Sequence, residues 1–143
     1  DFSRKLTDHI KLKGKLSHEQ VKQAMAWSDI YIQPSIQEGF CNAVLEAQAM
    51  GLLCIVTDAD GMKENILHGK TGWVIDKRSS IQISEMIIKI LSLSKEKHNQ
   101  IREAATKRVK DQFNLNKISI FGKSMKRCAS INVVKQARDE TIQ

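Results

Sequence analysis

The sequence has little of what would place it outside the ordinary globular proteins. Its 143 residues include one proline, three cysteines and 5% aromatic side chains. The scattered Cys41, Cys54 and Cys128 are too few for a disulfide framework, and neither they nor the single histidines have zinc-site spacing. No run approaches the roughly 18 consecutive apolar residues of a membrane span, and the first residues lack the pattern of a secretory leader. We therefore expect a cytoplasmic globular domain and no metal site.

Acidic residues are scarce towards one end of the chain. The net charge is +7, but residues 1–88 hold 10 basic and 11 acidic side chains, whereas residues 89–143 hold 13 and 5. Dispersed lysines of this kind are typical of a solvated helical face, and an anionic membrane surface to which the protein binds peripherally is the alternative. Only Phe113 and Phe121 interleave with them as stacking groups, so we expect no nucleic-acid partner.

Short apolar runs alternate with helical periodicity along the chain. Ser17 and Gln20 have the spacing of a capping box, and Gly51 has the position of a left-handed helix end. Strands are predicted at 9–14, 29–33, 52–57 and 72–75, and helices at 17–28, 42–50, 62–68, 80–93, 95–112 and 115–137. Strands separated by helices predict an α/β, Rossmann-like parallel sheet with helices on both faces. We expect this domain to cover residues 1–112, followed by a C-terminal helix and frayed tail over 113–143.

One strand-to-helix junction gathers the candidate ligand-binding groups. Ligands of parallel sheets bind beyond the carboxyl ends of the strands, and Pro34 ends such a strand. Gly39 permits close backbone approach, and the first N–H groups of the next helix are unpaired, which suits a phosphate or sugar hydroxyls. Glu38 precedes this helix and Glu46 lies about 12 Å further along it, too far for joint action on one bond. The two carboxylates could instead hold opposite ends of one extended ligand.

The segment Glu38–Gly51 (EGFCNAVLEAQAMG) resembles the E-x7-E signature of the retaining GT-B glycosyltransferases of family four. Flanking segments agree in the same order: 14–17 (GKLS), 28–35 (SDIYIQPS), 60–66 (DGMKENI) and 69–74 (GKTGWV). The resemblance covers about residues 9–128. It implies the C-terminal, nucleotide-sugar-binding half of a GT-B fold, without the N-terminal acceptor domain and the start of the donor domain. We therefore expect a fragment with little turnover alone.

The resemblance also implies a division of roles. Glu38 would be the catalytic residue, in contact with donor-sugar hydroxyls near the reacting carbon, and Glu46 would accept hydrogen bonds from the ribose. Backbone N–H groups would hold sugar hydroxyls at Gly39, Phe40 and Cys41 and the diphosphate at Asn42, Ala43, Val44 and Leu45. The turn of Lys15, Leu16 and Ser17 would border the base. The donor would be a UDP-, GDP- or ADP-linked sugar, transferred to a hydroxyl with retention, and no cofactor or metal is implied.

The sequence departs from the family pattern at several positions. Cys41 stands where glycine is usual, which can narrow the sugar pocket, and Asp60 replaces the first of two glycines in a loop expected to face the acceptor. Gln48 replaces a methionine, and we expect this change to affect only the helix surface. Two other functions stay open. One is a sugar-nucleotide epimerase of the GT-B fold, although the scattered single histidines argue against it. The other is a non-catalytic binding module.

Overall fold

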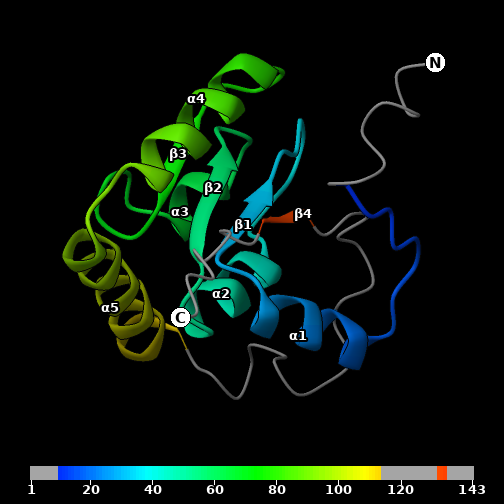
Figure 1. Cartoon of the computed structure of the whole chain (residues 1–143), viewed down its shortest axis with the longest axis horizontal. Coiled ribbons are helices and arrows are strands. Elements are labelled where there is room, and N and C mark those ends of the chain that lie inside the picture. Colours follow the sequence, from blue (N-terminus) through cyan, green and yellow to red (C-terminus); the bar gives the residue numbers. More distant parts are fainter. Residues whose placement is uncertain (1–9, 114–131, 135–143) are drawn as a thin grey trace, which may run out of the picture.

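A four-stranded sheet forms the centre of the molecule, as Figure 1 shows. The computed structural model describes residues 10–113 and 132–134. The strands are β1 (Ile30–Gln33), β2 (Leu53–Thr57), β3 (Trp73–Ile75) and β4 (Asn132–Val134), in the order β3-β2-β1-β4. The first three are parallel and β4 is antiparallel to β1. The carboxyl ends of β1, β2 and β3 therefore meet at one edge of the sheet.

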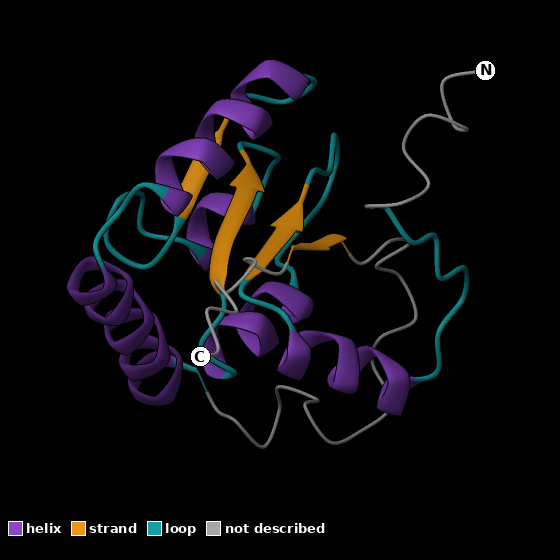
Figure 2. Cartoon of the chain, in the orientation of Figure 1, coloured by secondary structure: helices purple, strands orange, loops and turns teal. Residues whose placement is uncertain are grey.

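Helices connect the parallel strands and cover both faces of the sheet, as Figure 2 shows. They are α1 (His18–Trp27), α2 (Asn42–Ala49), α3 (Met62–Asn65), α4 (Ser80–Leu91) and α5 (Lys95–Gln112). This arrangement confirms the predicted α/β, Rossmann-like class. In the described part of the chain, no helix combines the length and the apolar character that crossing a membrane requires.

Local sequence signals set the helix ends where they were expected. The Ser17 hydroxyl accepts from the Gln20 N–H, and the Gln20 side chain accepts from the Ser17 N–H at 2.8 Å, which completes the capping box of α1. Gly51 follows α2 with a φ of +80°, the left-handed conformation that glycine adopts at least cost. Both predictions are confirmed.

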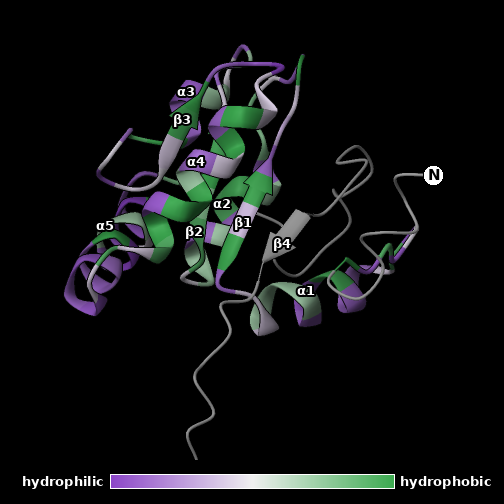
Figure 3. Cartoon of the chain, turned by 45° about the horizontal axis from the view of Figure 1, so that its top comes forward, coloured by the Kyte–Doolittle hydropathy of each residue, from purple (hydrophilic) through white to green (hydrophobic). Residues whose placement is uncertain are grey.

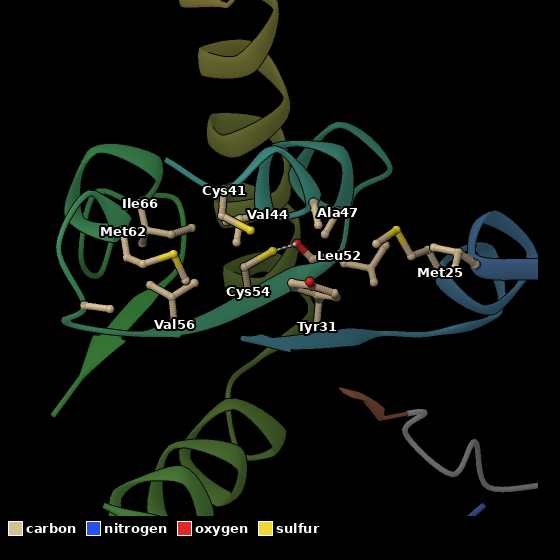
Figure 4. Close-up of a cluster of buried hydrophobic side chains, with 13 residues drawn as sticks. Met25, Tyr31, Cys41, Val44, Ala47, Leu52, Cys54, Val56, Met62 and Ile66 are labelled. Carbon is tan, nitrogen blue, oxygen red and sulfur yellow. Dashed lines mark hydrogen bonds between the residues drawn. The ribbon is translucent and has the colours of Figure 1, made fainter. Parts of the chain in front are cut away.

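Side chains alternate between the two faces of β1 and β2, whose hydropathy Figure 3 shows. Tyr31 and Cys54 point to the face covered by α1, α2 and α3, where they join Val44 and Ala47 in the cluster of Figure 4. The opposite cluster packs against α4 and the start of α5; its buried members are Ile30, Ile32, Leu53, Ile55, Trp73, Ile75, Ile90 and Ile101. The sheet thus lies between two apolar layers.

Three predicted elements differ from the structure. Residues 10–14 form no strand: Ile10 and Leu12, which would form the buried face of an alternating strand, are 50% and 93% exposed. Helix α3 ends at Asn65, short of the predicted 62–68. Residues 132–134, predicted as helix, form β4, since the edge of β1 offers backbone partners. His9 and the rest of the predicted tail helix, 115–131 and 135–137, lie outside the described residues.

Candidate functional site

The loop from Pro34 to Cys41 leaves the carboxyl end of β1 and leads directly into α2. Cys41 is the residue before the helix, and within the described part of the chain its side chain makes no capping hydrogen bond. Helix α2 therefore begins without the partner that Ser17 provides to α1. At Gly39, an added Cβ would find no atom within 4 Å, so the side of the backbone on which a side chain would stand faces open space. An uncapped helix start beside open backbone is suited to an anionic or hydroxyl-rich ligand.

The loop after β2 packs directly on this junction. Gly61 precedes α3 with a φ of +80°, and a Cβ there would lie 2.7 Å from the Gly39 carbonyl carbon and 2.8 Å from the Phe40 nitrogen. Backbone contact this close is possible only for glycine. The loop around Asp60 is therefore packed against the junction. Both segments follow the carboxyl ends of neighbouring strands, which brings them to the same edge of the sheet.

Asn65 fixes the backbone of Cys41. Its Oδ1 accepts from the Cys41 N–H at 3.0 Å and its Nδ2 donates to the Cys41 carbonyl at 3.1 Å. Both residues are buried, so the two bonds are shielded from water. The N–H of Cys41, which the resemblance assigned to a sugar hydroxyl, thus already has a partner within the protein.

Gln48 is the clearest correction to the sequence analysis. It is fully buried, with 0% exposure, rather than at the helix surface. Its Nε2 donates to the carbonyl oxygens of Val44, at 3.3 Å, and Asn65, at 3.0 Å. The reason is that α2 is covered on all sides. Its six consecutive residues from 43 to 48 are buried, so this part of the helix has no face exposed to solvent.

Helix α5 ties the same region together from outside. The Thr106 hydroxyl donates to the Gln48 carbonyl at 3.1 Å. The Arg108 guanidinium donates to the carbonyls of Asn65 at 2.9 Å and Glu64 at 2.7 Å, which close the end of α3. Burial lowers the pKa of Arg108. Residues on α5 were outside the predicted site, because nothing in an amphipathic helix pattern shows which polar side chain reaches a neighbouring carbonyl.

An aromatic contact connects α5 to the junction. The rings of Phe40 and Phe113 lie 5.5 Å apart, and Arg108 stands 5.2 Å above the Phe113 ring. Such ring pairs are worth about 0.5–1.5 kcal/mol beyond the area they bury. Phe40 is nevertheless 44% exposed. Its side chain is thus held on one side and open to solvent on the other.

Glu38 lies at the middle of the junction loop and is half-buried. Its Oε2 accepts a hydrogen bond from the Ser35 hydroxyl at 3.2 Å. Ser35 in turn is fixed by the end of β2, since the Thr57 hydroxyl donates to its carbonyl. The carboxylate therefore projects from a loop that both neighbouring strands anchor.

Glu46 has a different environment, although it lies only eight residues further on. It is 4% exposed, and burial raises its pKa to about 7 from 4.5, while the charge of His18 acts in the opposite direction. His18 is the first residue of α1, so the carboxyl of Glu46 and the start of α1 are close in space. In the same stretch Lys15 and Ser17 are exposed, whereas Leu16 packs against the apolar cluster under α1 and α2.

The remaining predicted residues line the first turns of α2. The side chain of Asn42 is half-buried, and those of Ala43 and Val44 are buried in the cluster below the helix. Leu45 packs with Val109 of α5. The Val44 N–H donates to the Cys41 carbonyl at 3.2 Å. Ala43, Val44 and Leu45 can thus offer a ligand only backbone groups, and the amides of Val44 and Cys41 already donate within the protein.

The described residues hold no group of three or more His, Cys, Asp or Glu side chains that could bind a metal ion. The chemistry on offer is therefore that of two separate carboxyl groups and a helix start. An ionised carboxylate accepts hydrogen bonds from hydroxyls, and backbone amides at a helix start attract phosphate.

Comparison with known proteins decides the family. The sequence pattern described as "Glycosyl transferases group 1" matches residues 3–108. This chain belongs to the group 1 glycosyltransferases. N-acetyl-alpha-D-glucosaminyl L-malate synthase of Bacillus anthracis is 32% identical over 113 residues, which are 79% of this chain and 29% of that protein. The family is one of transferases, so the epimerase alternative is not favoured.

Solved glycosyltransferases share the fold of this group 1 domain. Sucrose-phosphate synthase from Thermosynechococcus elongatus superposes with a TM-score of 0.73 at 21% identity, covering 82% of this chain and 29% of that one. The Anabaena HepE protein in complex with UDP-glucose gives 0.63 at 23% identity, covering 68% and 27%. The fold is the α/β fold of GT-B glycosyltransferases. The chain spans less than a third of the length of these proteins.

Proposed function

We propose that this group 1 glycosyltransferase domain binds the donor of a retaining sugar transfer, a nucleotide-diphosphate sugar. The observation that carries the proposal is the junction before α2, where an uncapped helix start lies between two carboxyl groups in different environments. Glu38 stands on the loop before the helix, and Glu46 is buried further along it, near the start of α1. This spacing suits one extended ligand with a sugar at one end and a nucleoside at the other.

Each part of such a donor has a matching group. The diphosphate takes the amides of Asn42 and Ala43, where the helix dipole favours negative charge. Sugar hydroxyls take the amides of Gly39 and Phe40 and the Glu38 carboxylate. The ribose hydroxyls donate to Glu46, and the base lies beside 15–17. The amides of Cys41 and Val44 are left out of this set because they donate within the protein.

The helix start serves the reaction as well as binding. When the bond to the sugar breaks, negative charge grows on the diphosphate, and amides already pointing at it stabilise that charge without reorganising. The reaction we propose transfers the sugar to a hydroxyl with retention of configuration. Because the chain spans under a third of its relatives, we propose that turnover needs a further domain to bring the acceptor.

Calorimetry with UDP-glucose and UDP tests the proposal on the chain as it stands. UDP-glucose is the probe because the Anabaena protein of the same fold was solved with it. Weak, saturable binding is expected, with amide NMR shifts confined to 15–17 and 38–46. Above pH 7, where the Glu46 carboxyl is ionised, Glu46→Ala should weaken UDP and UDP-glucose alike, by about 10-fold or more, since a hydrogen bond to a charged group is worth about 1.5–3 kcal/mol. Glu38→Ala should weaken UDP-glucose and spare UDP.

Glu85→Ala provides the matched control, because Glu85 is an exposed glutamate on α4, away from the junction. It should change neither affinity. Equal losses of both ligands in Glu38→Ala and Glu46→Ala would contradict the assigned roles. No binding of UDP- or GDP-sugars at millimolar concentration would favour a non-catalytic module.

A further inference from the structure

A continuous line of side-chain hydrogen bonds runs from the buried centre of β1 to Glu38. Tyr31 Oη donates to Gln33 Oε1 at 2.6 Å, and Gln33 Nε2 donates to Ser35 Oγ at 2.8 Å. Ser35 Oγ then donates to Glu38 Oε2 at 3.2 Å. Tyr31 and Gln33 are 0% and 4% exposed. The line thus starts on two buried side chains of β1 and ends at the carboxylate proposed to contact the sugar.

The carboxylate fixes the direction of every bond in this line. Ionised Glu38 can only accept, so the single hydroxyl proton of Ser35 must point at it. The Ser35 oxygen is then left to accept a hydrogen bond from Gln33, so the amide nitrogen of Gln33 faces Ser35. The amide oxygen is left facing Tyr31, whose hydroxyl donates to it. One orientation of the glutamine amide therefore satisfies all four groups.

The backbone of Ser35 is held independently of its side chain. The Thr57 hydroxyl, at the end of β2, donates to the Ser35 carbonyl. Pro34 before it restricts the chain by its fixed φ. Ser35 is thus attached to β1 through Gln33 and to β2 through Thr57, and its hydroxyl has little freedom to leave Glu38. A glutamate held this way loses less rotamer freedom on binding than a free one would.

We propose that Gln33 and Ser35 are positioning residues, which hold the Glu38 carboxylate ready for the donor sugar. This inference rests on the proposed function, since it assigns a purpose to the orientation of the same carboxylate. Neither residue touches the donor; both act through Glu38. Without the Ser35 hydroxyl, the Glu38 side chain turns freely on its loop and its contact with the sugar weakens.

The test compares the affinities for UDP-glucose and UDP by calorimetry. The dissociation constant of UDP divided by that of UDP-glucose measures the contribution of the sugar to binding. Ser35→Ala should reduce that ratio by about 5-fold, the effect of one hydrogen bond of about 1 kcal/mol, and leave UDP binding unchanged. Ser35→Thr keeps the hydroxyl and should restore the ratio. Ser84→Ala removes an exposed serine of α4 and is the matched control.

A double-mutant cycle separates positioning from general loosening of the loop. In a Glu38→Ala background, Ser35→Ala should cause no further loss of the ratio, because the group it positions is gone. If the two losses add, Ser35 acts on the sugar by another route and the inference is overturned.

NMR of the unliganded chain tests the line itself and remains available if Ser35→Ala fails to fold. The Gln33 side-chain NH₂ signals should shift in Tyr31→Phe, which removes one buried hydroxyl from the only tyrosine in the sequence. Glu38→Ala should shift them as well, from the other end of the line. Signals that respond to neither change would overturn the inference.

The inference and the proposed function fail in different ways. If the unmodified chain prefers UDP-glucose over UDP and Ser35→Ala keeps that preference, the positioning role is wrong and the donor site stands. If the unmodified chain binds no nucleotide or nucleotide-sugar, the proposed function falls and the positioning role falls with it.

Discussion

The two faces of the sheet are held by different interactions. The cluster under α4 is built mainly from isoleucine, and a buried polar contact lies beside it, between His98 Nε2 and the Ile90 carbonyl oxygen at 2.7 Å. The face under α2 adds buried amides, Gln48 and Asn65, to its apolar cluster. Both buried amides bond to backbone groups within or next to the junction proposed to hold the donor.

Apolar packing tolerates small shifts of one side chain against another, whereas a hydrogen bond fixes direction and distance. The α4 face therefore supplies mainly stability, and the hydrogen bonds next to the junction lie on the α2 face. A junction that must present amides to a ligand within a few tenths of an ångström is expected on the second kind of face. The predictions below test whether the two faces can be separated in this way.

Asn65→Ala should have the largest effect. It removes both bonds to Cys41 and leaves the buried Cys41 N–H without this acceptor, whereas the Cys41 carbonyl keeps the bond from the Val44 N–H, so we expect a loss of about 1–3 kcal/mol in unfolding free energy. Urea denaturation measures it, and NMR should show shifts over 39–43. Asn99→Ala, at an exposed position of α5, is the matched control and should change neither. These two hydrogen bonds form a clamp between Asn65 and Cys41. A loss below about 0.5 kcal/mol for Asn65→Ala would mean that this clamp does not hold the junction.

The second-largest effect should come from the titration of Glu46, which makes the unfolding free energy depend on pH. Its pKa is about 7 in the folded chain and 4.5 is the ordinary value, so the folded state keeps this proton to higher pH than the unfolded chain does. The resulting stabilisation is complete below about pH 4.5 and is lost as the pH rises through 7. Glu46→Gln should flatten that part of the stability profile, measured by urea unfolding at several pH values.

His18 gives this experiment its internal check. Its charge lowers the pKa of Glu46, so His18→Ala should raise that pKa further and extend the stability loss to higher pH. Identical profiles for the unmodified chain and Glu46→Gln would show that the carboxyl is hydrated and that the α2 face is not closed around it.

The sequence predicted those elements whose signals are local. The capping box at Ser17, the left-handed Gly51 and the apolar run of β2 depend on neighbours within a few residues, and the structure has all of them. The strand expected at 9–14 is absent over its described part, 10–14, because an alternating pattern alone does not supply a partner strand. The prediction for residues 132–134 was wrong in the opposite sense: a helix was expected, but they form a strand because they pair with the distant edge of β1.

The candidate site divides along the same line. The junction could be predicted as a candidate site because its residues are consecutive and match a family pattern. Asn65, Arg108 and the contact of Ser35 with Glu38 were missed, since each depends on a pair of side chains or on segments that the fold brings together. One signal was available for Gln33: a glutamine at the end of an otherwise apolar buried strand needs a polar partner.

Ile90→Val should separate the faces most cleanly. It removes one methylene from the fully buried Ile90 on the α4 side, at a cost of about 0.5–1.5 kcal/mol in unfolding free energy. The affinity for UDP-glucose should not change while the protein is folded. A fall in affinity, measured by calorimetry well below the unfolding midpoint, would show that packing under α4 reaches the junction across the sheet.

Gln48→Met should have the smallest effect on the unfolding free energy. Whether the change is a gain or a loss decides if the buried amide of Gln48 is needed. The Oε1 of Gln48 has no hydrogen-bond partner among the described residues, so the present side chain is incompletely satisfied. The Asn65 carbonyl keeps its bond from Arg108 when the amide is removed, and the Val44 carbonyl keeps its helical N–H. We therefore expect no change or a gain of up to about 1 kcal/mol by urea denaturation, with Gln100→Met on the exposed side of α5 as control.

A loss above about 1 kcal/mol in Gln48→Met would reverse the interpretation of the α2 face. It would mean that the amide of Gln48, and not only Asn65, fixes α2 against α3. The geometry of the junction would then depend on a network in which no member can be exchanged for an apolar residue. A neutral result would instead reduce the geometric task of this face to the single clamp between Asn65 and Cys41, which can then be varied alone.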